Sequence, residues 1–144
     1  MIARCCVFLG VSEAAFARSL FFDVLDGGGW TWGAGLDVRD PLYYSATGIT
    51  LSSIVLMQIG NLFGRRSRRG SGLTLDFLHN PLIVGGLLFE AVFSWAILYF
   101  PPVSTVLGTG PVSMELYAVA WCGPFLIFGL DFARKKLFDA LGKP

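Results

Sequence analysis

The sequence predicts an all-α integral membrane protein, a bundle of four transmembrane helices with both chain termini in the cytoplasm. Of its 144 residues, 54% are hydrophobic and only 15% are charged, and the mean hydropathy is +0.65. Soluble domains are seldom so apolar. Two basic clusters each follow a long apolar run, and such clusters mark the cytoplasmic face of a membrane protein. These clusters are Arg65, Arg66, Arg68 and Arg69, and then Arg134, Lys135 and Lys136.

Four runs have the length of a membrane span, since about 20 helical residues cross about 30 Å of hydrocarbon. We expect these helices over residues 2–25, 41–64, 81–100 and 113–137, in one membrane domain that covers residues 1–144. The outer loops are then residues 26–40 and 101–112, and the cytoplasmic loop is residues 65–80. With both basic clusters in the cytoplasm, the second and fourth helices end there, which also places both termini there.

The first run is the least apolar of the four. It is interrupted by four charges: Arg4, Glu13, Arg18 and Asp23. At roughly 2.5 to 3.5 kcal/mol each near the bilayer centre, these charges oppose insertion unless they lie near the helix ends. A cleaved signal peptide ending near Ala15–Ala17 is an alternative, but Glu13 lies where such a peptide is normally apolar.

Local signals predict where the later helices begin. Asn80 followed by Pro81 is a favourable start for the third helix, and Pro101 and Pro102 end it. Ser113 is the expected cap of the fourth helix. We expect Pro124 to kink that helix without breaking it.

Two amides lie at membrane depth in the second helix. Gln58 and Asn61 are three residues apart and therefore share a helix face. Their neutral carbonyl oxygens are suited to replace part of the hydration shell of a hard cation. The structural alternative is that both amides only join helices by hydrogen bonds.

Three acidic residues are further candidates. Glu90 is the only acid in the third span, where a carboxylate is expected to be protonated, paired or ion-bound, with Arg18 as one possible partner. Glu13 raises the same question, and its own pairing with Arg18 is possible. Asp131 lies near the cytoplasmic end of the fourth helix, where pairing with Arg134 and Lys135 is the simplest interpretation.

The order of these features resembles the last four transmembrane helices of type II P-type ATPases, the group of the calcium pump and the sodium/potassium pump. The resemblance covers essentially the whole chain. The segments that carry it are Ile54-Val-Leu-Met-Gln-Ile-Gly-Asn-Leu-Phe63, Arg65-Arg-Ser-Arg-Arg-Gly-Ser71, Asn80-Pro81, Leu98-Tyr-Phe-Pro-Pro102 and Gly129-Leu-Asp-Phe-Ala-Arg-Lys-Lys136.

The resemblance implies roles for single residues. Gln58 matches a cation-coordinating glutamate or glutamine, and Asn61 a polar residue one turn along the same face. Glu90 matches a glutamate of an additional ion or proton pathway. Asp131 matches an acid near the cytoplasmic end of the last helix, which is usually followed by glutamate, whereas Phe132 follows it here.

The resemblance implies a C-terminal membrane support domain, present as a fragment, a split gene product or a truncated reading frame. It contributes part of an ion-binding region and packs against the core transport helices. The phosphorylated aspartate and the nucleotide-binding domain do not fit in 144 residues, so the chain alone is not expected to be an enzyme. We expect no cofactor in this chain; ATP and Mg belong to the parent pump, and the transported cation is left open. The expected partners are the lipid bilayer and the remaining helices and cytoplasmic domains of a pump, and no nucleic acid.

Two interpretations from other classes stay open at this point. The first is a free-standing four-helix transporter that works as a dimer, with Glu13 or Glu90 as a proton-coupled carboxylate. The second is a structural membrane subunit that docks through small residues such as Gly85 and Gly86.

Overall fold

The computed structural model describes residues 2–66 and 75–142, and within them every regular element is helical. The all-α prediction is therefore confirmed for the described part of the chain. The elements are α1 (Ile2–Gly27), α2 (Pro41–Arg65), the 3-10 helix η1 (Leu75–His79), α3 (Pro81–Tyr99), α4 (Pro101–Leu107), α5 (Met114–Ala120) and α6 (Cys122–Ala140).

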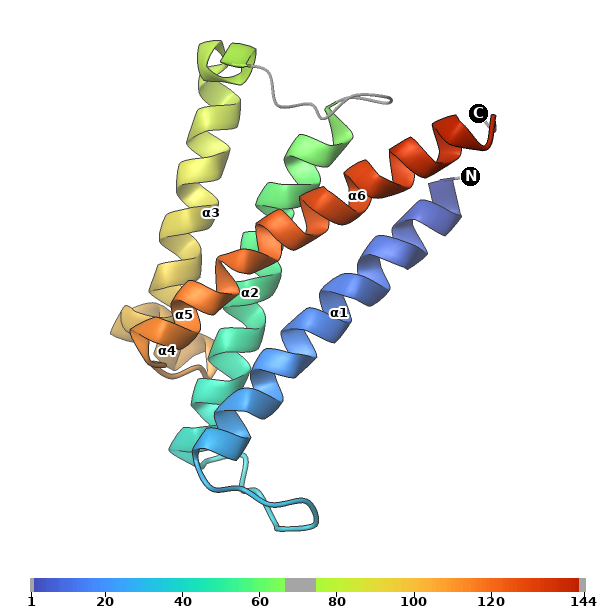
Figure 1. The fold of residues 1–144 in the computed structure, drawn as a ribbon. Coiled ribbons are helices and arrows are strands. Elements are labelled where there is room, and N and C mark those ends of the chain that lie inside the picture. The colour runs from blue at the N-terminus through green and yellow to red at the C-terminus, as the bar shows by residue number, and fades with distance from the viewer. Residues whose placement is uncertain (1, 67–74, 143–144) are drawn as a thin grey trace.

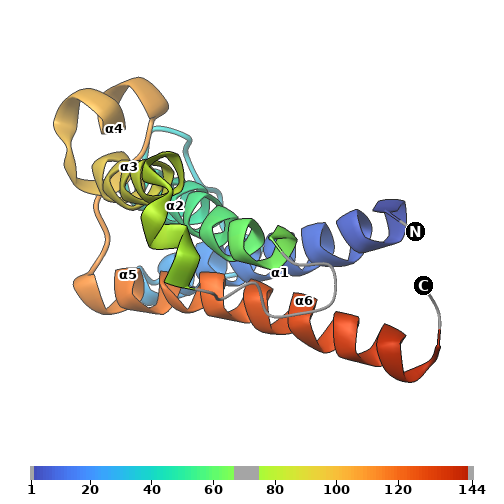
Figure 2. The same ribbon diagram turned by 90° about the horizontal axis from the view of Figure 1, so that it is seen from above.

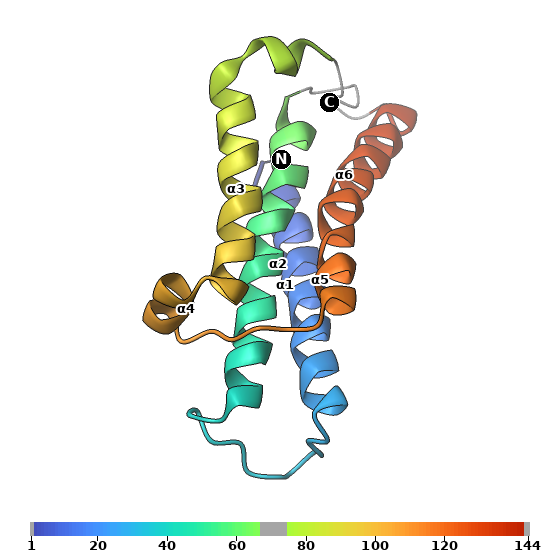
Figure 3. The same cartoon turned by 90° about the vertical axis from the view of Figure 1, so that its left-hand side faces the viewer.

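The long helices are arranged around α2, which packs against α1, α3 and α6 (Figure 1). Seen from above, α2 lies between α3 and the pair formed by α1 and α6 (Figure 2). The start of α1, the end of α2, η1 and the end of α6 all lie at one end of the bundle, and α4 lies at the opposite end (Figures 1 and 3). This is the arrangement that an up-and-down helical topology produces.

Three stretches of the described chain are long and apolar enough to cross a membrane: Pro41–Arg65, Pro81–Tyr99 and Met114–Ala140. Helix α1 has the necessary length, with 26 residues. It is not one of these three stretches, so a fourth span stays a prediction.

Helix starts follow the capping chemistry that the sequence predicts. The side chain of Asn80 accepts a hydrogen bond from the backbone N–H of Leu82, and Ser113 accepts one from Leu116. Asp40 caps α2 in the same manner through Leu42. Each cap satisfies a backbone donor that the first helical turn leaves free.

The structure adds detail to the expected fourth helix and to the expected loop over residues 101–112. The fourth helix is divided into α5 and α6 only at the single residue Trp121, which keeps helical φ and ψ of −66° and −15°, and Met114–Ala140 remains one candidate span, as the predicted kink requires. Pro124 explains the division, because it has no N–H to donate to the carbonyl of Ala120 and its ring opposes a continuous helix there. The expected loop over residues 101–112 begins with α4, because Pro101 and Pro102 suit the first turn of a helix.

Close packing between α2 and α6 depends on glycine. A Cβ atom on Gly60 would lie 2.4 Å from the backbone oxygen of Pro124, and one on Gly64 would lie 2.9 Å from Oδ2 of Asp131. Gly123 on α6 similarly leaves room for Met57. Small residues let membrane helices approach closely in this way.

Candidate ion-path residues

The two amides of α2 form a polar cluster with a carboxylate of α1. Asn61 Nδ2 donates to Glu13 Oε1 at 2.5 Å and to Gln58 Oε1 at 3.3 Å. The amide of Gln58 also folds back to the carbonyl oxygen of Ile54, at 3.5 Å. Three polar side chains from two helices therefore meet beside α2.

The sequence did not indicate the contact between Glu13 and Asn61. It suggested Arg18 as the partner of Glu13 instead. The guanidinium of Arg18 instead lies 5.3 Å from the ring centroid of Phe22, on the exposed side of α1. A signal for this contact is present in the sequence, because Glu13 lies on the same helical stripe as apolar residues that pack against α2. Ala17 and Leu20, the buried members of that stripe, are one and two turns further along.

Gln58 lies on a part of α2 that no other described helix covers. Its side chain is exposed, and Ile54 one turn earlier is 37% exposed. Met57 and Gly60, on the other side of the same turns, are buried. Ile54 and Gln58 therefore lie together on one exposed stripe of α2 that the other described helices do not cover.

Glu90 is half-buried on α3, and its Oε2 atom is buried without a hydrogen-bond partner among the described residues. The structure does not bring it to Arg18, the partner that the sequence suggested. The physical reason is the position of α2, which separates α3 from α1 (Figures 1 and 2).

Asp131 forms ion pairs with Arg134 at 2.6 Å and Lys135 at 2.7 Å. The predicted pairing within α6 is confirmed. The structure adds a contact that the sequence does not reveal: Lys135 Nζ donates a hydrogen bond to the backbone oxygen of Gly64, in the last turn of α2. The pair therefore joins α6 to α2.

The first basic cluster is described only in part. Arg65 is exposed, and the guanidinium carbon of Arg66 lies 5.9 Å from the ring centroid of Phe77. Arg68 and Arg69 lie outside the described residues.

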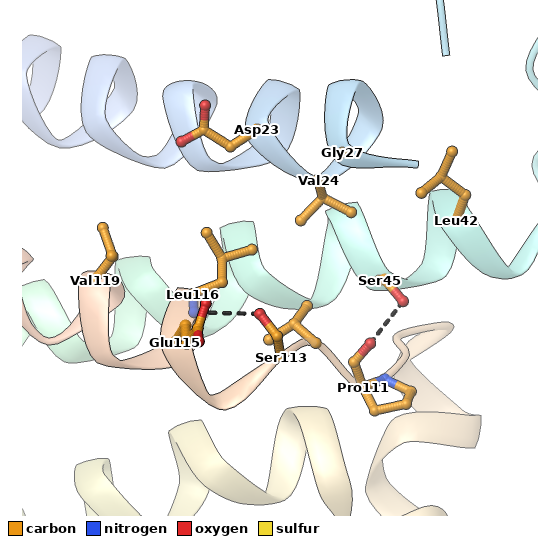
Figure 4. Close-up of a pocket in the computed structure, with 11 residues that line it drawn as sticks. Asp23, Val24, Gly27, Leu42, Ser45, Pro111, Ser113, Glu115, Leu116 and Val119 are labelled. Atoms are coloured by element: carbon orange, nitrogen blue, oxygen red, sulfur yellow. Dashed lines mark hydrogen bonds between the residues drawn. The ribbon is translucent and has the colours of Figure 1, made fainter. Parts of the chain in front are cut away.

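An open cleft of about 550 Å³ lies between α1, α2 and α5 (Figure 4), and neither Gln58 nor Asn61 lines it. Val24, Leu42 and Leu116 contribute apolar walls, and Asp23 and Glu115 are its two acidic residues. Ser45 Oγ donates to the carbonyl oxygen of Pro111 at 2.7 Å and so closes one side.

The cluster around Asn61 provides too few ligands for a complete cation site. Among the side chains that the structure describes, in residues 7–66 and 76–142, no group of three or more His, Cys, Asp or Glu is placed to hold a metal ion. A hard cation such as Ca²⁺ takes six to eight oxygen ligands. Glu13, Gln58 and Asn61 therefore fit only one side of a coordination shell.

The contact between Glu13 and Asn61 is testable as an interaction energy. We expect a double-mutant cycle with Glu13→Ala and Asn61→Ala to give a coupling energy of about 1 kcal/mol, the usual net contribution of one hydrogen bond. The measurement is the free energy of unfolding of the full chain in mixed micelles. The matched control pairs Asn61→Ala with Asp23→Ala, an exposed acid of the same helix, and should give a coupling near zero. Equal coupling in both cycles would contradict the contact.

Comparison with known proteins identifies the family of the chain. Residues 1–137 match the family model described as "Cation transporting ATPase, C-terminus". No curated protein matches the chain. The match covers nearly all 144 residues and confirms the resemblance inferred from the sequence. The chain belongs to the family of C-terminal membrane regions of cation-transporting P-type ATPases.

Proposed function

We propose that this chain is the membrane support region of a cation pump, that it packs against the pump's core transport helices, and that it contributes Gln58 and Asn61 to part of the ion-binding region. The observation that carries the proposal is the uncovered stripe of α2 that contains Ile54 and Gln58. An exposed amide at membrane depth is costly against lipid and is favourable against another polar surface.

The chemistry of the cluster supports a role beside a cation. In the structure the Asn61 N–H groups lie between Glu13 Oε1 and Gln58 Oε1. A half-turn of the Asn61 amide would exchange Nδ2 for Oδ1 and present three oxygens to one point. Glu13 is the only acidic side chain of this group, and the transport helices would supply the remaining ligands.

Glu90 is proposed to serve an additional ion or proton pathway. Its buried Oε2 atom has no hydrogen-bond partner among the described residues, which is the condition in which a carboxyl group accepts a proton or a cation. Asp131 is proposed to have a structural role instead, since two basic side chains already neutralise it.

The orientation of the chain follows from its charges. The ends of α2 and α6 carry the basic clusters and lie at the same end of the bundle (Figure 3). We propose that this end faces the cytoplasm, in agreement with the positive-inside rule. ATP hydrolysis, with its Mg²⁺ and phosphorylated aspartate, is assigned to the cytoplasmic domains of the pump, so the chain is not catalytic by itself.

We expect Gln58→Leu, placed in the intact pump, to raise the cation concentration needed for half-maximal ATPase activity about tenfold. The loss of one polar contact to the bound ion is expected to cost about 1.4 kcal/mol, which corresponds to that factor. The measurement is ATPase activity against cation concentration in proteoliposomes.

Two variants make this result specific. Gln58→Glu keeps a ligand oxygen and should retain cation stimulation, whereas Ile54→Leu changes the neighbouring apolar position and should leave the cation dependence unchanged. If Gln58→Leu retains the original half-maximal concentration, Gln58 serves helix packing and the proposed ligand role is wrong.

A further inference from the structure

Helix α4 is placed differently from the other helices. It follows α3 after the single residue Phe100, runs across the direction of α3 and projects from the side of the bundle (Figures 1 and 2). Its main partner in the described chain is α3. Most of its surface is therefore free of contact with the rest of the chain.

The sequence of α4 is amphipathic over its seven residues. Val103, Val106 and Leu107 have the i, i+3, i+4 spacing that places them on one helix face, and Ser104 and Thr105 lie on the opposite face. Val106 is 84% exposed and Leu107 is 40% exposed. No charged residue occurs from residue 100 to residue 114.

The exposed apolar face is held in place by the segment that follows it. Gly108 has a positive φ of 65° and ends α4, with its N–H donating to the carbonyl of Ser104. Thr109 Oγ1 then donates to the carbonyl of Ile97 at 2.5 Å, and the N–H of Gly110 donates to that of Tyr44 at 2.9 Å. The bonds of Thr109 and Gly110 join the segment after the C-terminal end of α4 to α3 and α2, and the N-terminal end of α4 follows α3 after one residue, so the orientation of α4 is fixed relative to the bundle.

The depth of α4 follows from α3. Because α3 is a membrane-spanning helix of 19 residues, its last turn reaches the boundary of the hydrocarbon layer. Trp95 and Tyr99 lie in that turn region with ring centroids 5.9 Å apart, and aromatic residues of this kind prefer the interface. A helix that begins at Pro101 and runs across α3 therefore lies at the level of the lipid head groups.

We propose that α4 lies flat in the membrane interface at the end of the bundle opposite the chain termini, with the bilayer as its partner. Val103, Val106 and Leu107 face the acyl chains, and Ser104 and Thr105 face the head groups and water. Burying a valine side chain in an apolar environment is favourable, and an aqueous position of Val106 would lose this gain. This inference needs only the membrane location of the chain and is independent of the proposed ion ligands.

The test is site-directed spin labelling of the full chain in phospholipid vesicles. Cys5, Cys6 and Cys122 are first replaced by serine. A nitroxide is then attached to Val106→Cys on the apolar face or, as the matched control, to Thr105→Cys on the polar face of the same turn. We expect the ratio of oxygen to water-soluble nickel-chelate accessibility to be several-fold higher at position 106 than at position 105.

Two other results would overturn the proposal. Equal, high nickel-chelate accessibility at both positions would place α4 in water. Low accessibility of position 106 to both reagents would mean that another protein segment covers the apolar face. If Val106→Cys does not fold, a label on Leu107→Cys tests the same face and should give the same high ratio.

Discussion

Gly60→Val is expected to separate α2 from α6 and to lower the free energy of unfolding by about 1 to 3 kcal/mol, the usual range for overpacking. The obstacle is the backbone oxygen of Pro124, which would lie 2.4 Å from the new Cβ atom. A backbone oxygen cannot move aside by a change of rotamer, so the two helices must shift. The change is measured by reversible unfolding of the full chain in mixed micelles.

Gly85→Val provides a matched control for this prediction. Gly85 also lies inside a helix, but a Cβ atom there has nothing within 4 Å. The two substitutions share the intrinsic difference in helix propensity between glycine and valine, so the difference between their effects reports the contact. If both variants lose the same stability, close packing at Gly60 does not hold α2 to α6.

Much of the fold could be predicted because its signals are local. A cap such as Asn80 acts on the N–H groups of its own first turn, and a run of apolar residues is visible without any knowledge of its neighbours. The kink near Pro124 is predicted from its missing N–H group, which is also a local signal.

For the candidate site, the sequence could predict only contacts between residues of the same helix. The shared face of Gln58 and Asn61 follows from their spacing, and so does the ion pair of Asp131 with Arg134. The contact of Glu13 with Asn61 and the contact of Lys135 with the backbone oxygen of Gly64 join different helices. Such contacts depend on the rotation and crossing of each helix, which spacing along one helix does not determine.

Asp131→Asn is expected to lower the free energy of unfolding by about 3 to 5 kcal/mol, because removing one member of a buried ion pair leaves the other charge without compensation. The side chains of Asp131 and Lys135 are 8% and 7% exposed. The hydrogen bond from Lys135 to the carbonyl of Gly64 would then hold an uncompensated ammonium group against the end of α2. Unfolding in mixed micelles is again the measurement.

A second variant shows whether the stranded charge causes this loss. Replacing Lys135 by methionine in the Asp131→Asn background removes the charge, so the double variant should recover part of the stability that Asp131→Asn loses. Asp139→Asn, at an exposed position of the same helix, should have an effect within about 0.5 kcal/mol of zero. Should Asp131→Asn prove as mild as Asp139→Asn, the pair would contribute little to stability, and the carboxylate of Asp131 would be free to act in the ion pathway.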